Sequence, residues 1–272
     1  MPPLAPAGNR PGGHRPVRLC ATLRPLSPAF AISPALALLL AAAPAPGAPV
    51  PGPSIPAPPP AGGEVKALVA RCVAAYGGPT ALELTAKLRE QGTVTSTMHP
   101  GEKAPLRRIY DRRRGLRVEV YWASGAEVRL LSAGRGWREG QEVQGPPLLA
   151  MLLQGARLDL PAILRAAGDR VADAGVVQHE GKPLRALRVG LGAGLTVEAD
   201  LDPATGRILR SRGASGGIPA IEFITTYSDF REVDGALIAF REGNWANGST
   251  TGETVLSLVS FLDRVPDEAF SP

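Results

Sequence analysis

The pattern of apolar and polar positions changes from a helical period to a strand period within the first half of the chain. Between Gly63 and Tyr76, apolar residues recur at the i, i+3, i+4, i+7 spacing of an amphipathic helix. Gly77 and Gly78 follow directly, and glycine commonly ends helices. A second, short helix is predicted from Pro79 to Leu88. We therefore expect the folded part of the chain to begin with two consecutive helices.

Beyond these helices the pattern alternates with the period of two that is typical of strands, and turn residues interrupt it. The segments with this pattern are Gly92 to Met98, Leu106 to Asp111, Leu116 to Trp122, Glu127 to Leu131, Val171 to His179, Leu184 to Val189, Leu195 to Asp200, Ile208 to Arg212, Ala220 to Tyr227, Leu237 to Phe240 and Thr254 to Leu262. Short strands that follow one another closely predict antiparallel meanders rather than β-α-β units.

One helical insertion interrupts the predicted strands. It covers Pro147 to Gln154, which is strongly apolar, and a short helix follows around Ala162 to Ala167. Such an apolar segment must be covered by other parts of the fold. The pattern therefore predicts an α+β fold, in which a strongly curved antiparallel sheet forms an unclosed β-barrel with helices across its concave face.

The last predicted strand, Thr254 to Leu262, is apolar on both faces. A strand that lines an apolar cavity has this pattern, but a central strand buried beneath a helix has it as well. In the first interpretation the apolar helix is a lid over a cavity, and in the second it is an ordinary core helix. The lid interpretation predicts a ligand cavity lined by Trp122, Leu148, Leu149, Met151, Leu152, Leu153, Phe223, Val259 and Phe261.

The N-terminal part of the chain differs in composition from the rest of the 272 residues. Of the 28 prolines, 17 lie within the first 60 residues, and four arginines but no acidic residue precede Pro49. A basic stretch, the apolar run from Ala35 to Ala43 and then small residues are typical of a secretory signal peptide. We expect a signal peptide over residues 1–47, cleaved after Gly47, then a Pro/Ala-rich linker over 48–62 and one domain over 63–272.

Few residues of the domain have the arrangement of a catalytic or metal site. His99 and His179 lie in different strand contexts, and neither belongs to an HExxH pattern. Cys72 falls at a helical core position, and Gly190 to Gly194 joins two strands as a hairpin rather than as a phosphate loop. Outside the leader, 26 basic side chains face 25 acidic ones, which gives no reason to expect nucleic acid. We expect no metal or other cofactor, while hydrolysis through the two histidines stays a third hypothesis.

The strongest local charge feature is an arginine-rich segment that contains Arg107, Arg108, Arg112, Arg113, Arg114 and Arg117. The first five of these are the predicted contacts with an anionic surface, either lipid headgroups or an acidic partner. The alternative is a solvated hairpin rim with acidic residues nearby.

Two dipeptides predict hairpin turns in the C-terminal half. These are Asp234-Gly235 and Asn247-Gly248, although Asn247 also begins a glycosylation sequon. Tyr227 is expected to end the strand before the first turn. Asp229 and Arg231 are expected to form an ion pair across that turn. All of these residues are interpreted as structural.

Several small motifs in a fixed order resemble the periplasmic outer-membrane lipoprotein-sorting (LolA/LolB-like) superfamily. They are Tyr76-Gly77-Gly78, Gly136-Trp137, Asp202 to Gly206, Tyr227 to Gly235 and Phe270-Ser-Pro272. The resemblance covers the chain from about Gly63 to its end, and it implies an unclosed antiparallel barrel around helices, with an apolar cavity for acyl chains. One departure is Ala239, where such relatives often have proline. Another is the lack of a lipid-attachment cysteine after the leader, because Cys20 precedes the apolar run.

These observations together predict a soluble, monomeric, non-enzymatic periplasmic carrier for lipid or for the acyl chains of a lipoprotein. Binding would depend mainly on apolar burial, with few polar contacts to orient the ligand. The alternative is an envelope sensor or interaction module that binds a partner protein through the same fold, possible partners including an envelope membrane protein. Co-purified lipid would favour the carrier, whereas a filled interior with a stable protein partner would favour the sensor.

Overall fold

The structure is a computed structural model that describes residues 62–192, 194–215 and 221–272. The predicted signal peptide, residues 1–47, lies outside the described residues. So does the predicted linker, residues 48–62, except for Gly62, which begins the first helix.

Thirteen strands form a single antiparallel sheet in the described part of the chain. Their bounds are β1 Lys87–Ser96, β2 His99–Asp111, β3 Gly115–Trp122, β4 Gly125–Ser132, β5 Arg135–Arg138, β6 Gln141–Val143, β7 Ala172–His179, β8 Lys182–Gly192, β9 Leu195–Leu201, β10 Ile208–Ser215, β11 Glu222–Val233, β12 Ala236–Ala246 and β13 Ser249–Phe261.

The strand order places two meanders side by side. It is β6-β5-β4-β3-β2-β1-β13-β12-β11-β10-β9-β8-β7, so the first and last strands pair in the middle of the sheet. The chain leaves the first meander at β6, one edge of the sheet, and enters the second at β7, the other edge. The crossing is made by α3 (Pro146–Arg157), α4 (Leu160–Ala167) and the 3₁₀ helix η1 (Gly168–Arg170). The topology therefore requires these helices to run from one edge of the sheet to the other.

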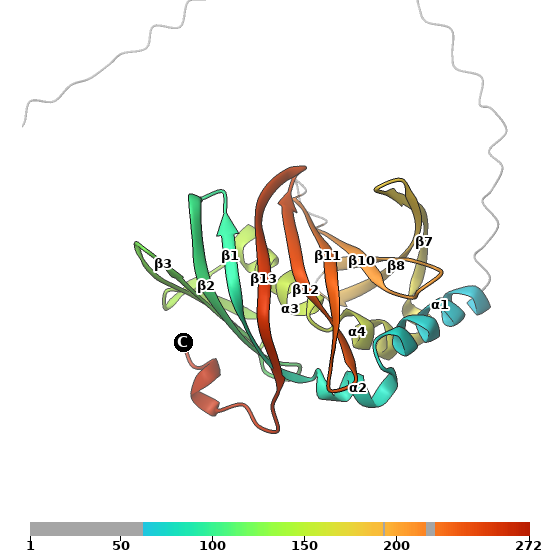
Figure 1. Ribbon diagram of the computed structural model, residues 1–272, viewed down its shortest axis with the longest axis horizontal. Helices are drawn as coiled ribbons and strands as arrows, with labels where there is room; N and C mark the ends of the chain where they lie inside the picture. Colours follow the sequence, from blue (N-terminus) through green and yellow to red (C-terminus); the bar gives the residue numbers. More distant parts are fainter. Residues whose placement is uncertain (1–61, 193, 216–220) are drawn as a thin grey trace, which may run out of the picture. The chain divides into compact units, whose positions relative to one another are not determined.

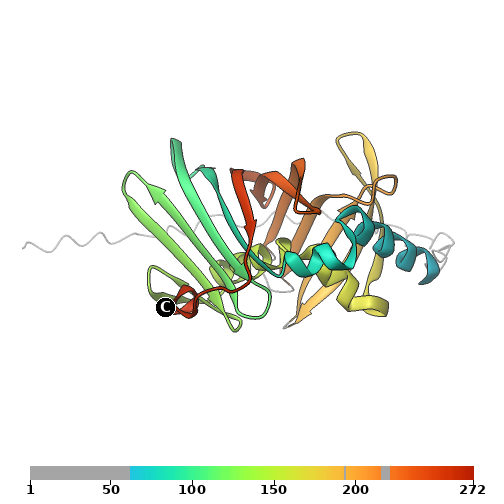
Figure 2. The same cartoon turned by 60° about the horizontal axis from the view of Figure 1, so that its bottom comes forward.

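The sheet curves around α3. This helix contacts β4 and β5 in the first meander and β10 in the second, although six strands separate β4 from β10 in the sheet. One helix can contact strands so far apart in the sheet only if the sheet is strongly curved. Figures 1 and 2 show α3 and α4 within this curve. The edge strands β6 and β7 do not pair in the described part of the chain, so the predicted unclosed barrel with helices on its concave face is confirmed.

The first two helices follow the apolar spacing of the sequence. The helix α1 (Gly62–Ala75) buries Val65, Leu68, Cys72 and Val73, and α2 (Gly78–Leu84) follows after a sharp turn. At the turn Gly77 has φ 92°, and a Cβ added there would lie 2.0 Å from the Gly235 carbonyl oxygen, so the position requires glycine.

The predicted second helix extends too far. Leu88 lies in β1, where it pairs with Tyr110 of β2 and Phe261 of β13 and is fully buried. The burial available between two neighbouring strands therefore outweighs the helical spacing. The sequence pattern also predicts neither β5 nor β6, because these short strands are mostly polar and lack the alternation.

The buried apolar side chains form two main clusters on the concave side. One cluster joins α1, α3 and α4 to strands β8 to β10, and it includes Leu153, Leu164 and Val197. The other lies mainly on β1 to β3, β12 and β13, and it includes Leu106, Val118 and Met151. Leu152 of α3 packs against both clusters. A third, smaller cluster joins Leu130 of β4 to Val265 and to Phe270 of the C-terminal 3₁₀ helix η2 (Asp267–Phe270).

A β-bulge explains why the last strand is apolar on both faces. In the pairing of β1 with β13, Gln91 lies opposite Leu258 but Gly92 lies opposite Leu256, so Ser257 is the extra residue. The bulge places Leu256 and Val259 in the same buried cluster and leaves Leu258 52% exposed. The strand is central in the sheet. Because the bulge shifts the alternation by one residue, apolar residues at both odd and even positions do not mean that both faces are covered.

The structure corrects the account of the Tyr227 to Gly235 segment. Tyr227 lies within β11, which continues to Val233, and Asp229 has a positive φ of 51° there although the register with β12 does not change. Arg231 donates to both carboxylate oxygens of Asp229, so this ion pair lies within one strand and not across the turn. The predicted turns at Asp234-Gly235 and Asn247-Gly248 are confirmed, and in both the two residues have positive φ.

Candidate functional site

A small cavity lies on the concave side where α2, the α3–α4 junction and strands β11 and β12 meet. Its volume is about 70 Å³. Most of its wall is apolar and includes Leu82, Leu160 and Ile238, while its polar residues are Tyr76, Thr85, Glu90, Arg157, Tyr227 and Glu242. An apolar cavity of roughly 150 Å³ accommodates a benzene-sized ligand, so this small cavity cannot enclose an acyl chain by itself.

A cluster of buried charged side chains lies beside this cavity. Arg108 of β2 is 1% exposed, and its two terminal nitrogens donate to the carboxylate of Glu242 on β12 at 2.9 and 2.6 Å. The same guanidinium donates to Glu90 Oε2 of β1 at 3.1 Å. Arg108 Nε is buried and has no hydrogen-bond partner among the described residues. One buried cation is thus shared by two carboxylates.

This arrangement shifts the pKa values of the cluster. Burial raises the pKa of Glu90 to about 7, against the opposing effect of Arg108, and the neighbouring Glu242 raises it further. Burial alone would lower the pKa of Arg108, but the carboxylates of Glu242 and Glu90 raise it above its ordinary value. Arg108 is therefore always charged, whereas Glu90 changes its charge near neutral pH.

Arg157 reaches the cavity from the last turn of α3. Its Nη1 donates to Thr225 Oγ1 of β11 and, at 3.4 Å, to Asn244 Oδ1 of β12. These partners are neutral, and burial lowers the pKa of Arg157 below its ordinary value. Tyr76 lies on the same wall, where its hydroxyl accepts a hydrogen bond from the Ile208 amide at 3.2 Å.

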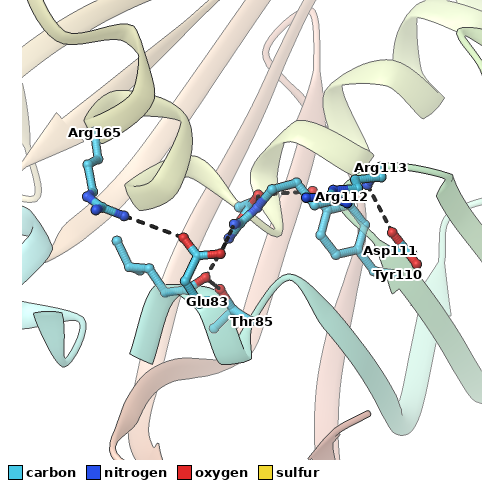
Figure 3. Close-up of polar contacts among 9 residues, drawn as sticks. Glu83, Thr85, Tyr110, Asp111, Arg112, Arg113 and Arg165 are labelled. Atoms are coloured by element: carbon cyan, nitrogen blue, oxygen red, sulfur yellow. Dashed lines mark hydrogen bonds and ion pairs between the residues drawn. The ribbon is translucent and has the colours of Figure 1, made fainter. Parts of the chain in front are cut away.

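The junction between α3 and α4 is held by a second polar cluster, which Figure 3 shows. Asp159 is 2% exposed and accepts hydrogen bonds from Arg112 Nε at 2.5 Å, Arg112 Nη2 at 3.0 Å and the Tyr110 hydroxyl at 3.2 Å. Arg112 also donates to Glu83 of α2 at 3.1 Å, and Arg165 of α4 lies 3.5 Å from the same carboxylate. Strand β2 therefore fixes the position at which the helix pair bends.

The nine residues predicted to line a cavity are all found in or against the two concave clusters. None of them lines the small cavity described above. Trp122, Met151, Val259, Leu148 and Phe261 belong to the cluster on β1 to β3, β12 and β13. Leu153, Leu149 and Phe223 belong to the cluster under α1 and α4, and Leu152 joins both. As a ligand surface they stay a prediction that requires α3 to move.

The arginines of the arginine-rich segment differ in burial and in their partners. Arg108 is buried, so its predicted contact with an anionic surface is wrong. Arg112 binds the helix junction, and Arg114 donates to the Val265 carbonyl at 3.0 Å and lies over the Phe270 ring. Arg107 and Arg113 are exposed, and Arg107 lies beside the Tyr121 ring. The surface contact stays a prediction for these two and for Arg112 and Arg114, whose side chains are partly exposed.

The two histidines do not form a common site. His99 of β2 stacks on Trp122 with ring centroids 4.0 Å apart, whereas His179 ends the edge strand β7. The described residues hold no group of three histidine, cysteine or acidic side chains that could bind a metal. Cys72 is fully buried, as its helical position predicts, and burial raises the pKa of its thiol to about 12.

Glu90, Arg157 and Glu242 are not among the site residues predicted from the sequence. For the strand residues of the cluster, the signal that could have found them is a charge at an alternating core position. Arg108 lies between Leu106 and Tyr110, and Glu242 follows Phe240, each at the spacing that places side chains on one face of a strand. Charged residues are seldom placed at such positions unless they have partners.

No single helix in the described residues is long and apolar enough to cross a membrane. The α3 segment and the segment Leu160–Arg170 pass such a test only when taken together, and they are bent by 83° relative to each other.

Comparison with known proteins identifies the fold. No protein-family model and no curated protein matches the sequence. Among solved structures, a LolA superfamily protein from Nitrosomonas europaea matches with a TM-score of 0.51 at 12% identity, over 76% of this chain and 97% of that one. An outer membrane lipoprotein-sorting protein domain from Vibrio parahaemolyticus gives 0.48 at 11% identity, over 77% and 97%. A DUF1329 family protein from Desulfovibrio piger gives 0.46 at 10% identity, over 76% and 97%. The described chain therefore has a LolA-like fold.

Proposed function

We propose that the protein is a non-enzymatic periplasmic carrier that binds a lipid, or the acyl chain of a lipoprotein, between the α3–α4 pair and the concave face of the sheet. The observation that carries this proposal is that Leu152 packs against both apolar clusters. The helix α3 thus covers apolar surface on both arms of the sheet at once. Its displacement would open one continuous apolar surface without breaking any strand pair.

The likeness of the fold to a LolA superfamily protein supports the same proposal. The leader predicted over residues 1–47 supports a periplasmic location. Because the cavity beside the α3–α4 junction is small, a ligand that binds under α3 must replace contacts of α3 with the sheet. Apolar burial contributes about 25 cal/mol for each Å² removed from water, so an acyl chain can offset the contacts that α3 loses.

A charge placed on the inner side of α3 tests this proposal. Leu152→Asp should weaken binding of the neutral fluorescent probe N-phenyl-1-naphthylamine at least tenfold, because a carboxylate would face the chain of the ligand. Gln154→Asp on the same helix is the matched control, since Gln154 belongs to neither apolar cluster, and it should leave the affinity within about twofold. Circular dichroism melts would show that both variants keep the sheet folded.

Two results would contradict the carrier function. One is cooperative unfolding of the whole domain by Leu152→Asp and also by Met151→Asp, which would indicate an ordinary core helix. The other is a wild-type protein that binds no probe and carries no lipid in mass spectra of its organic extract. A stable protein partner in that second case would favour the sensor alternative.

A further inference from the structure

The cavity beside the α3–α4 junction is lined by both apolar and polar groups. Its apolar lining comes from α2, α4, β1, β10, β12 and the α3–α4 junction, whereas its charged and hydroxyl groups come from the end of α3, from β1, β11 and β12, from Thr85 after α2 and from Tyr76 after α1. A cavity with both kinds of lining suits a ligand that has both kinds of surface.

Arg157 is the cation of this wall without a carboxylate partner. No carboxylate of the described residues lies within 4.0 Å of its guanidinium, in contrast to Arg108, which binds two. Both hydrogen bonds that Arg157 donates to described residues come from Nη1. Its Nε and Nη2 therefore have no acceptor among the described residues. A half-buried guanidinium whose donors have no protein acceptor favours an anion. The hydroxyl proton of Tyr76 is likewise not donated to a described residue.

The surrounding charges restrict which anion fits. Arg108 neutralises Glu242 through two hydrogen bonds, and Glu90 is the remaining carboxylate, which faces Arg108, Glu242 and the cavity. When Glu90 is protonated the four groups Glu90, Arg108, Arg157 and Glu242 carry a net charge of +1, and a single negative charge balances it. A carboxylate brings one charge and two oxygens that match a guanidinium, whereas a phosphate dianion would bring excess negative charge next to Glu242.

We propose that this cavity binds the carboxylate group of an amphipathic ligand, with the guanidinium of Arg157 as its cation and the Tyr76 hydroxyl as a second donor. A cavity of about 70 Å³ holds such a group and the first carbons attached to it. The remainder of a long chain then lies between α3 and the sheet. The assignment of a long-chain ligand rests on the carrier function proposed above, but the carboxylate site itself does not.

The test compares oleate with oleyl alcohol as competitors of N-phenyl-1-naphthylamine. The two have the same chain and differ only in the head group. Wild-type protein should bind oleate about tenfold or more tighter than oleyl alcohol, since hydrogen bonds between charged groups are stronger than those of a neutral hydroxyl. Arg157→Gln should bring that ratio close to one, because it weakens the binding of oleate more than that of oleyl alcohol. Arg157→Lys should keep part of the preference, because it retains the charge but not the paired donors.

A matched control and a second ligand make the outcomes distinct. Arg170→Gln removes an exposed arginine from η1 and should leave the ratio unchanged. Propionate titrated by calorimetry tests the head-group site without any need for α3 to move, because it is smaller than benzene, and its binding should be lost in Arg157→Gln but not in Arg170→Gln. Binding of propionate without binding of the probe or of oleate would contradict the carrier function alone. An oleate preference that persists in Arg157→Gln, or propionate binding that does not depend on Arg157, would overturn the carboxylate site.

Discussion

Glu90 is a buried carboxylate whose protonation depends on the neighbouring charges. It is 3% exposed and shares the guanidinium of Arg108 with Glu242. Removing one partner of a buried ion pair leaves an uncompensated charge, whereas replacing the whole pair by apolar residues of similar volume is often tolerated. A group that is buried and near its pKa at neutral pH links proton binding to the stability of the fold.

We predict that Glu90→Gln changes how stability depends on pH. Folding raises the pKa of Glu90 to about 7, so between its ordinary value and 7 the folded state binds more protons than the unfolded state. The free energy of unfolding should therefore fall as pH rises from about 5 to 7, by at most about 1.4 kcal/mol per pH unit, and then level off. Urea denaturation at pH 5, 6, 7 and 8 should show this slope in the wild type and a flatter profile in Glu90→Gln.

The exposed Glu232 of β11 provides the control for this prediction. Glu232→Gln should keep the wild-type slope. Burial also raises the pKa of Asp159, which adds a slope of the same sign that starts at lower pH and stays in both variants. An unchanged slope between pH 6 and 7 in Glu90→Gln would show that the buried carboxylate is not the group that titrates there.

At the scale of elements, residues at the end of β2 and directly after it hold the bend between α3 and α4. Asp159 receives three hydrogen bonds from Arg112 and Tyr110, and Arg112 connects it to Glu83 of α2. These contacts hold together three elements that are distant in sequence. A carrier that moves α3 must either keep this junction as a pivot or break it.

We predict that Asp159→Asn loosens the helix pair more than it affects the sheet. The variant keeps the shape of the side chain but loses the charge that faces Arg112, whose side chain is 28% exposed. The cost should be about 1–3 kcal/mol of unfolding free energy. Hydrogen exchange should accelerate in α3 and α4 and change little in β1, β2 and β13. Arg165→Ala breaks only an exposed pair with Glu83 and should cost under about 0.5 kcal/mol. Equal acceleration in helices and sheet would contradict this role of the junction.

The elements themselves were largely predictable because their signals are local. The apolar spacing of α1, the apolar run of α3 and the Asn247-Gly248 turn each depend on neighbouring residues only. The polar cavity was not predictable in this way. Arg108 and Glu242 are 134 residues apart in sequence and meet only because β1 and β13 join the two meanders. The bulge at Ser257 likewise depends on the register between distant strands, and it reverses the face on which later residues lie.

At the scale of the whole molecule, the helix pair follows from the connectivity of the sheet. Because the two meanders pair through β1 and β13, their free ends lie at opposite edges, and α3 and α4 must connect them across the concave side. The cover of the concave face is thus also the link between the two halves of the chain. It can move away from the sheet and stay attached at both ends.

Close packing of α3 on β10 shows what such a movement has to break. Leu153 is fully buried, and a Cβ added to Gly213 would lie 2.9 Å from Leu153 Cγ and 2.3 Å from Cδ2. No larger residue fits at this position of β10 unless α3 shifts. The helix and the strand therefore lie close enough for a covalent link between positions 153 and 213, because disulfides need Cβ atoms about 3.5–4.5 Å apart.

We predict that a disulfide between these positions prevents ligand binding reversibly. The variant is Leu153→Cys with Gly213→Cys, in a background of Cys72→Ala that removes the buried thiol of the same cluster. When oxidised, α3 stays on β10 and the space behind it stays too small for an acyl chain, so binding of N-phenyl-1-naphthylamine should fall at least tenfold. Reduction should restore it. Leu153→Cys alone in the same Cys72→Ala background, treated with the same oxidant, should show no such dependence, because it removes the side chain that would meet a Cβ at position 213 and leaves no second thiol to pair with. If the cross-linked protein binds the probe as well as the reduced protein does, the ligand reaches its site without displacing α3, and the binding surface must be sought outside the curve of the sheet.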